Sequence, residues 1–268
     1  SGQSPLVPRC ALRYEGGMLG VLEAMAATRR RLSQDSRWQT VLQRVLLLLS
    51  IAAGIGYLPA IVGASEPVRA VIKILSIAPL VILPLLVVPA RLGLSLALLA
   101  SLLGDINLVF PGKVWFLRGL LAFLAAHIVY VYLFSKQTRK PLRLTAAEIL
   151  GCAFLVSGAI SALAFLWPWL GVMQLPVLVY ASALTGMNIA ALLTRMPGVF
   201  FGALLFLISD TLLGLRIFGG LPGWSSFFIW ATYYAAQLSI TCGYLGAAPT
   251  RSETPDELRD ATGSAPPK

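Results

Sequence analysis

Long apolar runs dominate this sequence and restrict it to one kind of fold. Eight of them, about 18 to 23 residues each, follow one another with short links between residues 41 and 246. Their apolar residues are continuous and do not alternate with polar ones, as strands would require. Each run is long enough for a helix to cross roughly 30 Å of hydrocarbon, and a helix satisfies its own backbone hydrogen bonds there. The chain is therefore predicted to be an all-α, polytopic membrane helical bundle.

Composition supports this class and suggests three regions. Of the 268 residues, 57% are hydrophobic and 12% are charged, and the mean hydropathy is +0.81. That is far too apolar for a soluble domain of this length. We predict a basic N-terminal segment over residues 1–38, an eight-helix transmembrane domain over 39–246 and a disordered tail over 247–268. The expected spans are residues 41–62, 70–90, 92–110, 114–134, 145–167, 172–194, 197–218 and 225–246.

Basic residues predict how the bundle is oriented. With a cytoplasmic N-terminus, 16 of the 21 Lys and Arg residues fall on the inner side. The positive-inside rule therefore places both termini in the cytoplasm. The net charge of +10 fits this orientation and an anionic lipid surface, and no nucleic-acid module is evident. The basic residues on the outer side are then Arg69, Lys73, Lys113, Arg118 and Arg216.

Two aspartates lie inside predicted spans. Asp105 follows Gly104 near the end of the third span, and Asp210 follows Ser209 near the middle of the seventh. A charged group in mid-span costs on the order of 3 kcal/mol, so we expect both to line a polar cavity. The alternative for each is a carboxylate that reaches the interface or a structural hydrogen bond between helices. Because four spans separate them, we also predict a four-plus-four parallel internal repeat with both aspartates at one depth.

Other polar residues of the spans are candidates for the same cavity. Lys73 either reaches outward to the interface or serves as a counter-ion to an aspartate. His127, the only histidine, is either a structural hydrogen-bonding group or an acid, base or positioning group. Glu148 is expected to be a helix N-terminal acid. No His, Cys or carboxylate spacing suggests a metal, so we expect neither metal nor cofactor. The neighbouring spans add Tyr130, Tyr180, Asn188, Tyr234 and Gln237, the last two sharing a helix face.

An ordered set of motifs resembles the YhhN-like lysoplasmalogenase family. The motifs are GDINLVF, LRGLLAFLAAHIVYVYLF, GALLFLISDTLLGL and TYYAAQLSIT, with Tyr180 and Met187 between the second and the third. The similarity runs from about Leu58 to Gly246, and Lys73 falls where the family often has a lysine. The resemblance implies a multi-span membrane hydrolase. It would cleave the vinyl ether bond of lysoplasmalogens (1-alkenyl-sn-glycero-3-phosphoethanolamine or -choline) to a fatty aldehyde and a glycerophospho-alcohol.

The two aspartates suit that chemistry. A vinyl ether is stable to base but opens when its alkenyl carbon is protonated. The reaction needs one protonated carboxylic acid, and a nearby carboxylate that stabilises the oxocarbenium ion and accepts a proton from water. We hypothesise that Asp105 and Asp210 form this pair, with Lys73, His127 and Gln237 tuning or positioning them. The sequence leaves open which aspartate is the acid.

The expected substrate is a single-chain lysophospholipid that enters sideways from the bilayer. Its tail would lie between helices, and its phosphate would lie near Lys73, Lys113 or Arg118 on the outer face. We expect a multi-pass protein of the bacterial inner (plasma) membrane, without a nucleic-acid partner. The sequence indicates no particular oligomeric state.

Two other classes of protein also use acids inside membranes. An intramembrane aspartyl protease has two aspartates on neighbouring spans, but LLGD here lacks the first glycine of the GxGD signature. A proton-coupled transporter or a non-catalytic lipid-binding membrane protein would also explain buried acids and a parallel repeat. A transporter leaves its ligand chemically unchanged, whereas the enzyme would release aldehyde in detergent without any gradient.

Overall fold

All regular secondary structure in the described part of the chain is helical. A computed structural model describes residues 18–87, 92–138 and 142–246, which hold eight α-helices, one 3-10 helix and no strand. The predicted tail, residues 247–268, and the first part of the N-terminal segment, residues 1–17, lie outside the described residues. The elements are α1 (Met18–Gly63), α2 (Glu66–Val87), α3 (Leu92–Val109), α4 (Lys113–Gln137), α5 (Ala146–Leu170), η2 (Gly171–Met173), α6 (Gln174–Leu193), α7 (Pro197–Ile217) and α8 (Ser225–Gly246).

The chain divides into two compact units, residues 1–45 and residues 46–268. Helix α1 begins at Met18, earlier than the apolar run that the sequence marks from residue 41. The preceding residues are rich in Ala, Leu and Arg, which are good helix formers, so the helix extends beyond the apolar part. The site described below lies wholly within the second unit.

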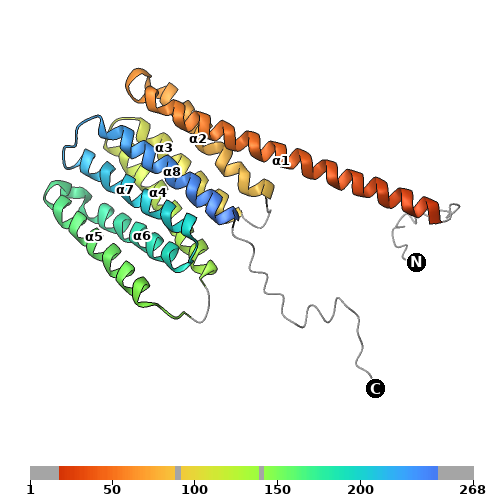
Figure 1. Cartoon of the computed structure of the whole chain (residues 1–268). Helices are drawn as coiled ribbons and strands as arrows, with labels where there is room; N and C mark the ends of the chain where they lie inside the picture. Colours follow the sequence, from red (N-terminus) through yellow and green to blue (C-terminus); the bar gives the residue numbers. More distant parts are fainter. Residues whose placement is uncertain (1–17, 88–91, 139–141, 247–268) are drawn as a thin grey trace, which may run out of the picture. The chain divides into compact units, whose positions relative to one another are not determined.

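Within the second unit the helices pack mainly as neighbours along the chain. Helix α3 packs against α2 and α4, α7 packs against α8, and α6 contacts α4, α5 and α7. Figure 1 shows α7 beside α8 and α5 beside α6. Helix α2 also contacts α8, which brings the beginning and the end of this unit together.

The helices fit a multi-pass membrane protein. Six segments of the described chain are long and apolar enough to cross a membrane, and one of them, Ala146–Leu193, takes in α5, η2 and α6. Helix α8 is not among the six; its sequence carries three tyrosines, a glutamine and several serines and threonines. The all-α membrane bundle predicted from the sequence is thus confirmed. The number of eight crossings and the internal repeat stay predictions.

Small residues allow α7 and α8 to approach closely. A Cβ atom at Gly202 would lie 2.9 Å from the carbonyl oxygen of Ala236 and 2.8 Å from the backbone nitrogen of Ile240. A Cβ atom at Gly243 would lie 2.8 Å from the backbone nitrogen of Val199. Only glycine fits at these points, because the obstacle is backbone that has no room to move. The close packing holds together α7, which supplies Asp210, and α8, which supplies Tyr233 beside Asp105.

A capping box starts α5. The side chain of Thr145 accepts a hydrogen bond from the backbone of Glu148, whose carboxylate accepts one from the Thr145 backbone at 2.8 Å. Nε of Arg195, in the link after α6, donates to the same carboxylate at 2.8 Å. Glu148 is therefore the helix N-terminal acid that the sequence predicts.

Candidate active site

A large cavity of about 1140 Å³ lies at one end of the bundle. Its walls include Val62 at the end of α1, Gly112 between α3 and α4, Gly171 between α5 and α6, and Gly223 between α7 and α8. The cavity therefore lies where the end of α1 and these three links meet. Both aspartates singled out in the sequence line it, as do aromatic residues of α4 and α8.

Cationic side chains outnumber carboxylates around this cavity. Four basic residues and two acids line it, and all four bases belong to the group that the orientation prediction places on the outer side. Of the three residues expected near a phosphate, Lys73 and Lys113 line the cavity. Arg118 is not among the lining residues, and its guanidinium lies 5.1 Å from the ring centroid of Trp115. The charged lining residues are Arg69, Lys73, Lys113, Arg216, Asp105 and Asp210.

Asp105 is held in a buried ion pair. Its side chain on α3 is 3% exposed, and Nζ of Lys73 on α2 donates to Oδ1 at 2.9 Å. The hydroxyl of Tyr233 on α8 donates to Oδ2. The Lys73 ammonium also lies 5.3 Å and 5.5 Å from the ring centroids of Trp230 and Tyr57, at cation–π distance. Lys73 is thus the counter-ion of an aspartate and does not reach outward to the interface.

A chain of hydrogen bonds reaches Asp105 from α4. The Tyr130 hydroxyl donates to Oε1 of Gln237 at 2.9 Å, and Nε2 of Gln237 donates to the Tyr233 oxygen at 3.1 Å. Tyr130 and Gln237 are completely buried. Because the amide occupies the Tyr233 oxygen as a donor, the Tyr233 proton is directed to Asp105. Helices α4, α8, α2 and α3 therefore cooperate to place this one carboxylate.

Asp210 on α7 has different neighbours. Its Oδ2 accepts a hydrogen bond from Tyr180 on α6. Nε2 of His127 is 3.9 Å from the same oxygen, beyond hydrogen-bond distance. The His127 ring is completely buried, edge-on to Tyr180 and Phe206, and neither of its nitrogens has a hydrogen-bond partner among the described residues. No lysine or arginine of the described chain forms an ion pair with Asp210.

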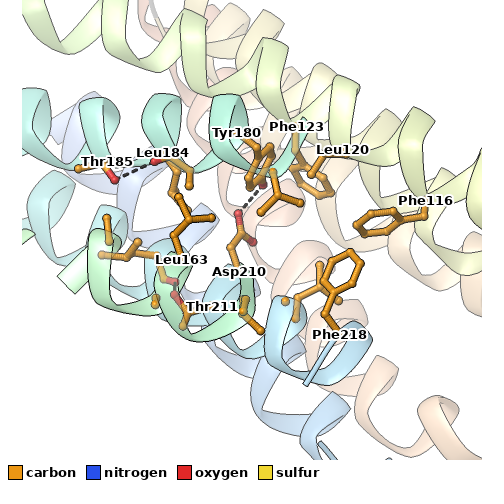
Figure 2. A pocket seen from close by; sticks show the side chains of 18 of the residues that line it. Phe116, Leu120, Phe123, Leu163, Tyr180, Leu184, Thr185, Asp210, Thr211 and Phe218 are labelled. Atoms are coloured by element: carbon orange, nitrogen blue, oxygen red, sulfur yellow. Dashed lines mark hydrogen bonds between the residues drawn. The ribbon is translucent and has the colours of Figure 1, made fainter. Parts of the chain in front are cut away.

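A second, apolar pocket of about 100 Å³ also borders Asp210. It lies between α4, α5, α6 and α7, and Figure 2 shows Asp210 among their side chains, with a dashed line joining it to Tyr180. The labelled side chains around it include Phe116 and Phe123 from α4 and Leu163 from α5. Asp210 therefore stands at the border between a polar cavity and a hydrocarbon-lined pocket.

Tyr233 is the neighbour of Asp105 that the sequence analysis missed. The residue predicted for the site was Tyr234. Its hydroxyl, however, is 2.8 Å from Oγ of Ser50 on α1, and its ring stacks on Trp230. The signal that could have found Tyr233 is its spacing of four residues from Gln237, which places two side chains on one helix face as well as a spacing of three does.

Asn188 is likewise not brought to the aspartates. Its Nδ2 donates to the carbonyl of Leu184 in its own helix at 3.0 Å, and it lines neither pocket. By contrast, Lys73, His127 and Tyr180 lie next to an aspartate. Tyr130 and Gln237 are connected to Asp105 through Tyr233. Within the described residues, no group of three or more His, Cys, Asp and Glu is arranged to hold a metal ion.

The sequence model of the YhhN family matches residues 68–244, which include both aspartates, Lys73 and His127. The chain belongs to the YhhN family. Among its relatives are proteins named lysoplasmalogenase from Mycobacterium bovis and Mycobacterium tuberculosis, each 34% identical over 171 residues. The aligned regions cover 58% of this chain and 64% of each mycobacterial protein, so the YhhN chain spans somewhat less than two thirds of their length.

Animal proteins are similar over the same part of the chain. Lysoplasmalogenase TMEM86B from Sus scrofa is 34% identical over 149 residues, which cover 54% of this chain and 60% of that protein. Lysoplasmalogenase TMEM86A from Bos taurus is 30% identical over 183 residues, covering 64% and 72%. No solved structure matches the chain.

Proposed function

We propose that this YhhN family protein is a membrane hydrolase that cleaves the vinyl ether bond of lysoplasmalogens. The observation that carries the proposal is the placement of Asp105 and Asp210 on one cavity in unlike surroundings. The names of the mycobacterial and animal relatives agree with this reaction. Such an enzyme needs one carboxylic acid and one carboxylate beside the same bond.

Asp105 is assigned as the carboxylate. Lys73 supplies a counter-charge at 2.9 Å, and Tyr233 donates a further hydrogen bond. A buried carboxylate with a cation on one oxygen and a hydroxyl on the other is a satisfied anion. Asp105 then stabilises the cationic intermediate and accepts a proton from the water that adds to it.

Asp210 is assigned as the acid. Its neighbours are the Tyr180 hydroxyl and the His127 ring, whose nitrogens have no hydrogen-bond partner among the described residues. No lysine or arginine of the described chain is paired with Asp210. An isolated charge in such surroundings is costly, so the neutral acid is the form that this site accommodates. Asp210 also borders both pockets, where the reacting bond of an amphiphile would lie.

The proposed reaction balances with water alone. Asp210 transfers its proton to the alkenyl carbon that is β to the ether oxygen, which leaves an oxocarbenium ion. Water adds to the adjacent carbon and gives a proton to Asp105. The resulting hemiacetal collapses to a fatty aldehyde and the free hydroxyl of glycerophosphoethanolamine or glycerophosphocholine. In this step Asp105 returns its proton to the departing oxygen and Asp210 takes the hemiacetal hydroxyl proton, which restores both groups. One C–O bond breaks, and nothing is oxidised or reduced.

The cations of the cavity suit a phosphodiester head group. Arg69, Lys113 and Arg216 line it without a salt bridge among the described residues. Nε of Arg69 is buried and has no hydrogen-bond partner there. Arginine binds phosphate oxygens through a planar fork of donors, so these residues are assigned to the substrate phosphate. With the proposed cytoplasmic termini, the cavity faces the outer side of the bacterial inner membrane.

Aldehyde release tests the proposal. The detergent-purified protein should release aldehyde from a 1-alkenyl lysophospholipid and leave a 1-acyl lysophospholipid intact. Asp105→Asn and Asp210→Asn should each lower kcat by about 100-fold or more. Glu66→Gln is the matched control, since Glu66 is an exposed acid that lines neither pocket. Absence of release by folded protein would contradict the proposed reaction, and full turnover by either Asn variant would contradict the aspartate pair.

A further inference from the structure

The polar cavity and the apolar pocket lie next to each other. They share aliphatic and aromatic residues from α3, α4 and α7 and the link that follows α7, together with one carboxylate. A ligand that fills both would have a polar part beside the cations and an apolar part between α4, α5, α6 and α7. The shared residues are Leu108, Phe116, Phe123, Asp210, Leu213 and Phe218.

We propose that the apolar pocket binds the proximal part of the substrate's hydrocarbon chain. The inference rests on the proposed function, because it takes the substrate to be a single-chain amphiphile with an anionic head group. It adds a location for the substrate's hydrocarbon chain, which would extend past Asp210 and along α5. The vinyl ether then lies at the border of the two pockets, next to Asp210.

The polar groups in the wall of the apolar pocket are already engaged. Thr185 donates to the carbonyl of Ala181 at 2.7 Å, and Thr211 donates to the carbonyl of Leu207 at 2.8 Å. The Tyr180 hydroxyl is bonded to Asp210. The threonines therefore present methyl groups, and the wall offers hydrocarbon to whatever fills it. Pockets of this kind take apolar ligands and exclude water.

The contacts of α5 indicate where the hydrocarbon chain would leave the pocket for the bilayer. Helix α5 packs along α6 and has only sparse contact with α7. A volume of about 100 Å³ accommodates a small hydrocarbon group and not a whole fatty chain. The distal part of the chain therefore passes between α5 and α7 into the lipid. Substitutions on the inner face of α5 should act on the chain and leave the head group unaffected.

Ala162→Phe tests this placement, with Ala164→Phe as its matched control. Ala162 lines the pocket, whereas Ala164 is exposed on another face of the same helix. With a long-chain 1-alkenyl lysophospholipid, Ala162→Phe should raise KM by about tenfold or more, because the ring overfills the pocket. The effect should shrink with a 1-alkenyl substrate whose chain is too short to reach the pocket, and Ala164→Phe should behave as the parent. Equal effects of both variants, or an effect independent of chain length, would overturn the inference.

A binding measurement decides the matter without turnover. Ala162→Cys and Ala164→Cys are labelled with a maleimide, with and without a saturated 1-alkyl lysophospholipid, which has no vinyl ether to cleave. Labelling of the parent gives the background from the three native cysteines, Cys10, Cys152 and Cys242. The ligand should slow labelling at position 162 several-fold and leave position 164 unchanged, and equal labelling would overturn the chain site. Protection at 162 in a protein that releases no aldehyde would support the chain site and contradict the hydrolase proposal alone.

Discussion

Replacing Lys73 by methionine should expose the role of the buried ion pair. The Lys73 Nζ to Asp105 Oδ1 distance is 2.9 Å, and the two side chains are 11% and 3% exposed. Methionine keeps most of the length of the lysine stem and removes only the charge and its donors. Among the described residues, Asp105 is then left with the Tyr233 hydroxyl as its hydrogen-bond partner.

The burial of the pair sets the expected loss of stability. Removing one partner of a buried ion pair costs about 3–5 kcal/mol, because the remaining charge is uncompensated. For a unit of about 200 residues this corresponds to a fall in Tm of roughly 6–20 °C. The double variant Lys73→Met/Asp105→Asn removes both charges and should be more stable than the sum of the single variants predicts. Turnover should fall about 100-fold or more in Lys73→Met, since the carboxylate loses its counter-ion.

The assay combines thermal unfolding in detergent with aldehyde release. Lys113→Met is the control, because Lys113 lines the same cavity but forms no salt bridge within the described residues. Its Tm should remain close to that of the parent. A double variant whose Tm change equals the sum of the two single changes would refute the coupling between Lys73 and Asp105. A Lys73→Met protein whose Tm equals that of the parent would also refute this coupling.

Three further predictions concern packing, capping and the hydrogen-bond chain. Gly202→Ala should destabilise the protein by about 1–3 kcal/mol because its methyl group presses on the α8 backbone. Gly158→Ala, in open space on α5, should not destabilise it, and equal Tm shifts would contradict the close contact. Thr145→Ala should cost about 1 kcal/mol and Thr145→Ser almost nothing, so a serine variant as unstable as alanine would argue against the cap. Tyr130→Phe removes the donor to a buried amide oxygen and should lower Tm by the equivalent of about 1–3 kcal/mol and reduce kcat, whereas an unchanged Tm and kcat would contradict the chain.

The helices could be predicted well from the sequence. The run expected over residues 197–218 is α7, Pro197–Ile217, and the run expected over 225–246 is α8, Ser225–Gly246. Polar and glycine-containing links separate the runs, and each apolar run must be helical if it lies in lipid. The start of α1 was harder to predict, because helix formers continue on the N-terminal side of the apolar run and hydropathy does not register them.

The sequence did not determine which side of each helix faces the interior of the bundle. In a soluble helix, the apolar stripe shows which side is buried. Here both the lipid-facing and the inner sides are apolar, so periodicity does not distinguish them. Tyr233 and Tyr234 are adjacent in the sequence, yet one bonds to Asp105 and the other lies beside Ser50. The second pocket went unpredicted for the same reason, since its walls are ordinary membrane-helix residues.

The border position of Asp210 connects the fold to the proposed chemistry. Hydrolysis of a lipid's vinyl ether needs water on one side of the vinyl ether group and room for the hydrocarbon chain on the other. A cavity lined only by polar groups would supply the water but would not hold the chain, and an apolar pocket alone would exclude the water. Asp210 borders both, while Asp105 lies on the polar side with Lys73 as its counter-ion. A proton donor next to hydrocarbon and a compensated carboxylate next to water are the arrangement that the reaction requires. Two aspartates in equivalent surroundings would not divide these tasks.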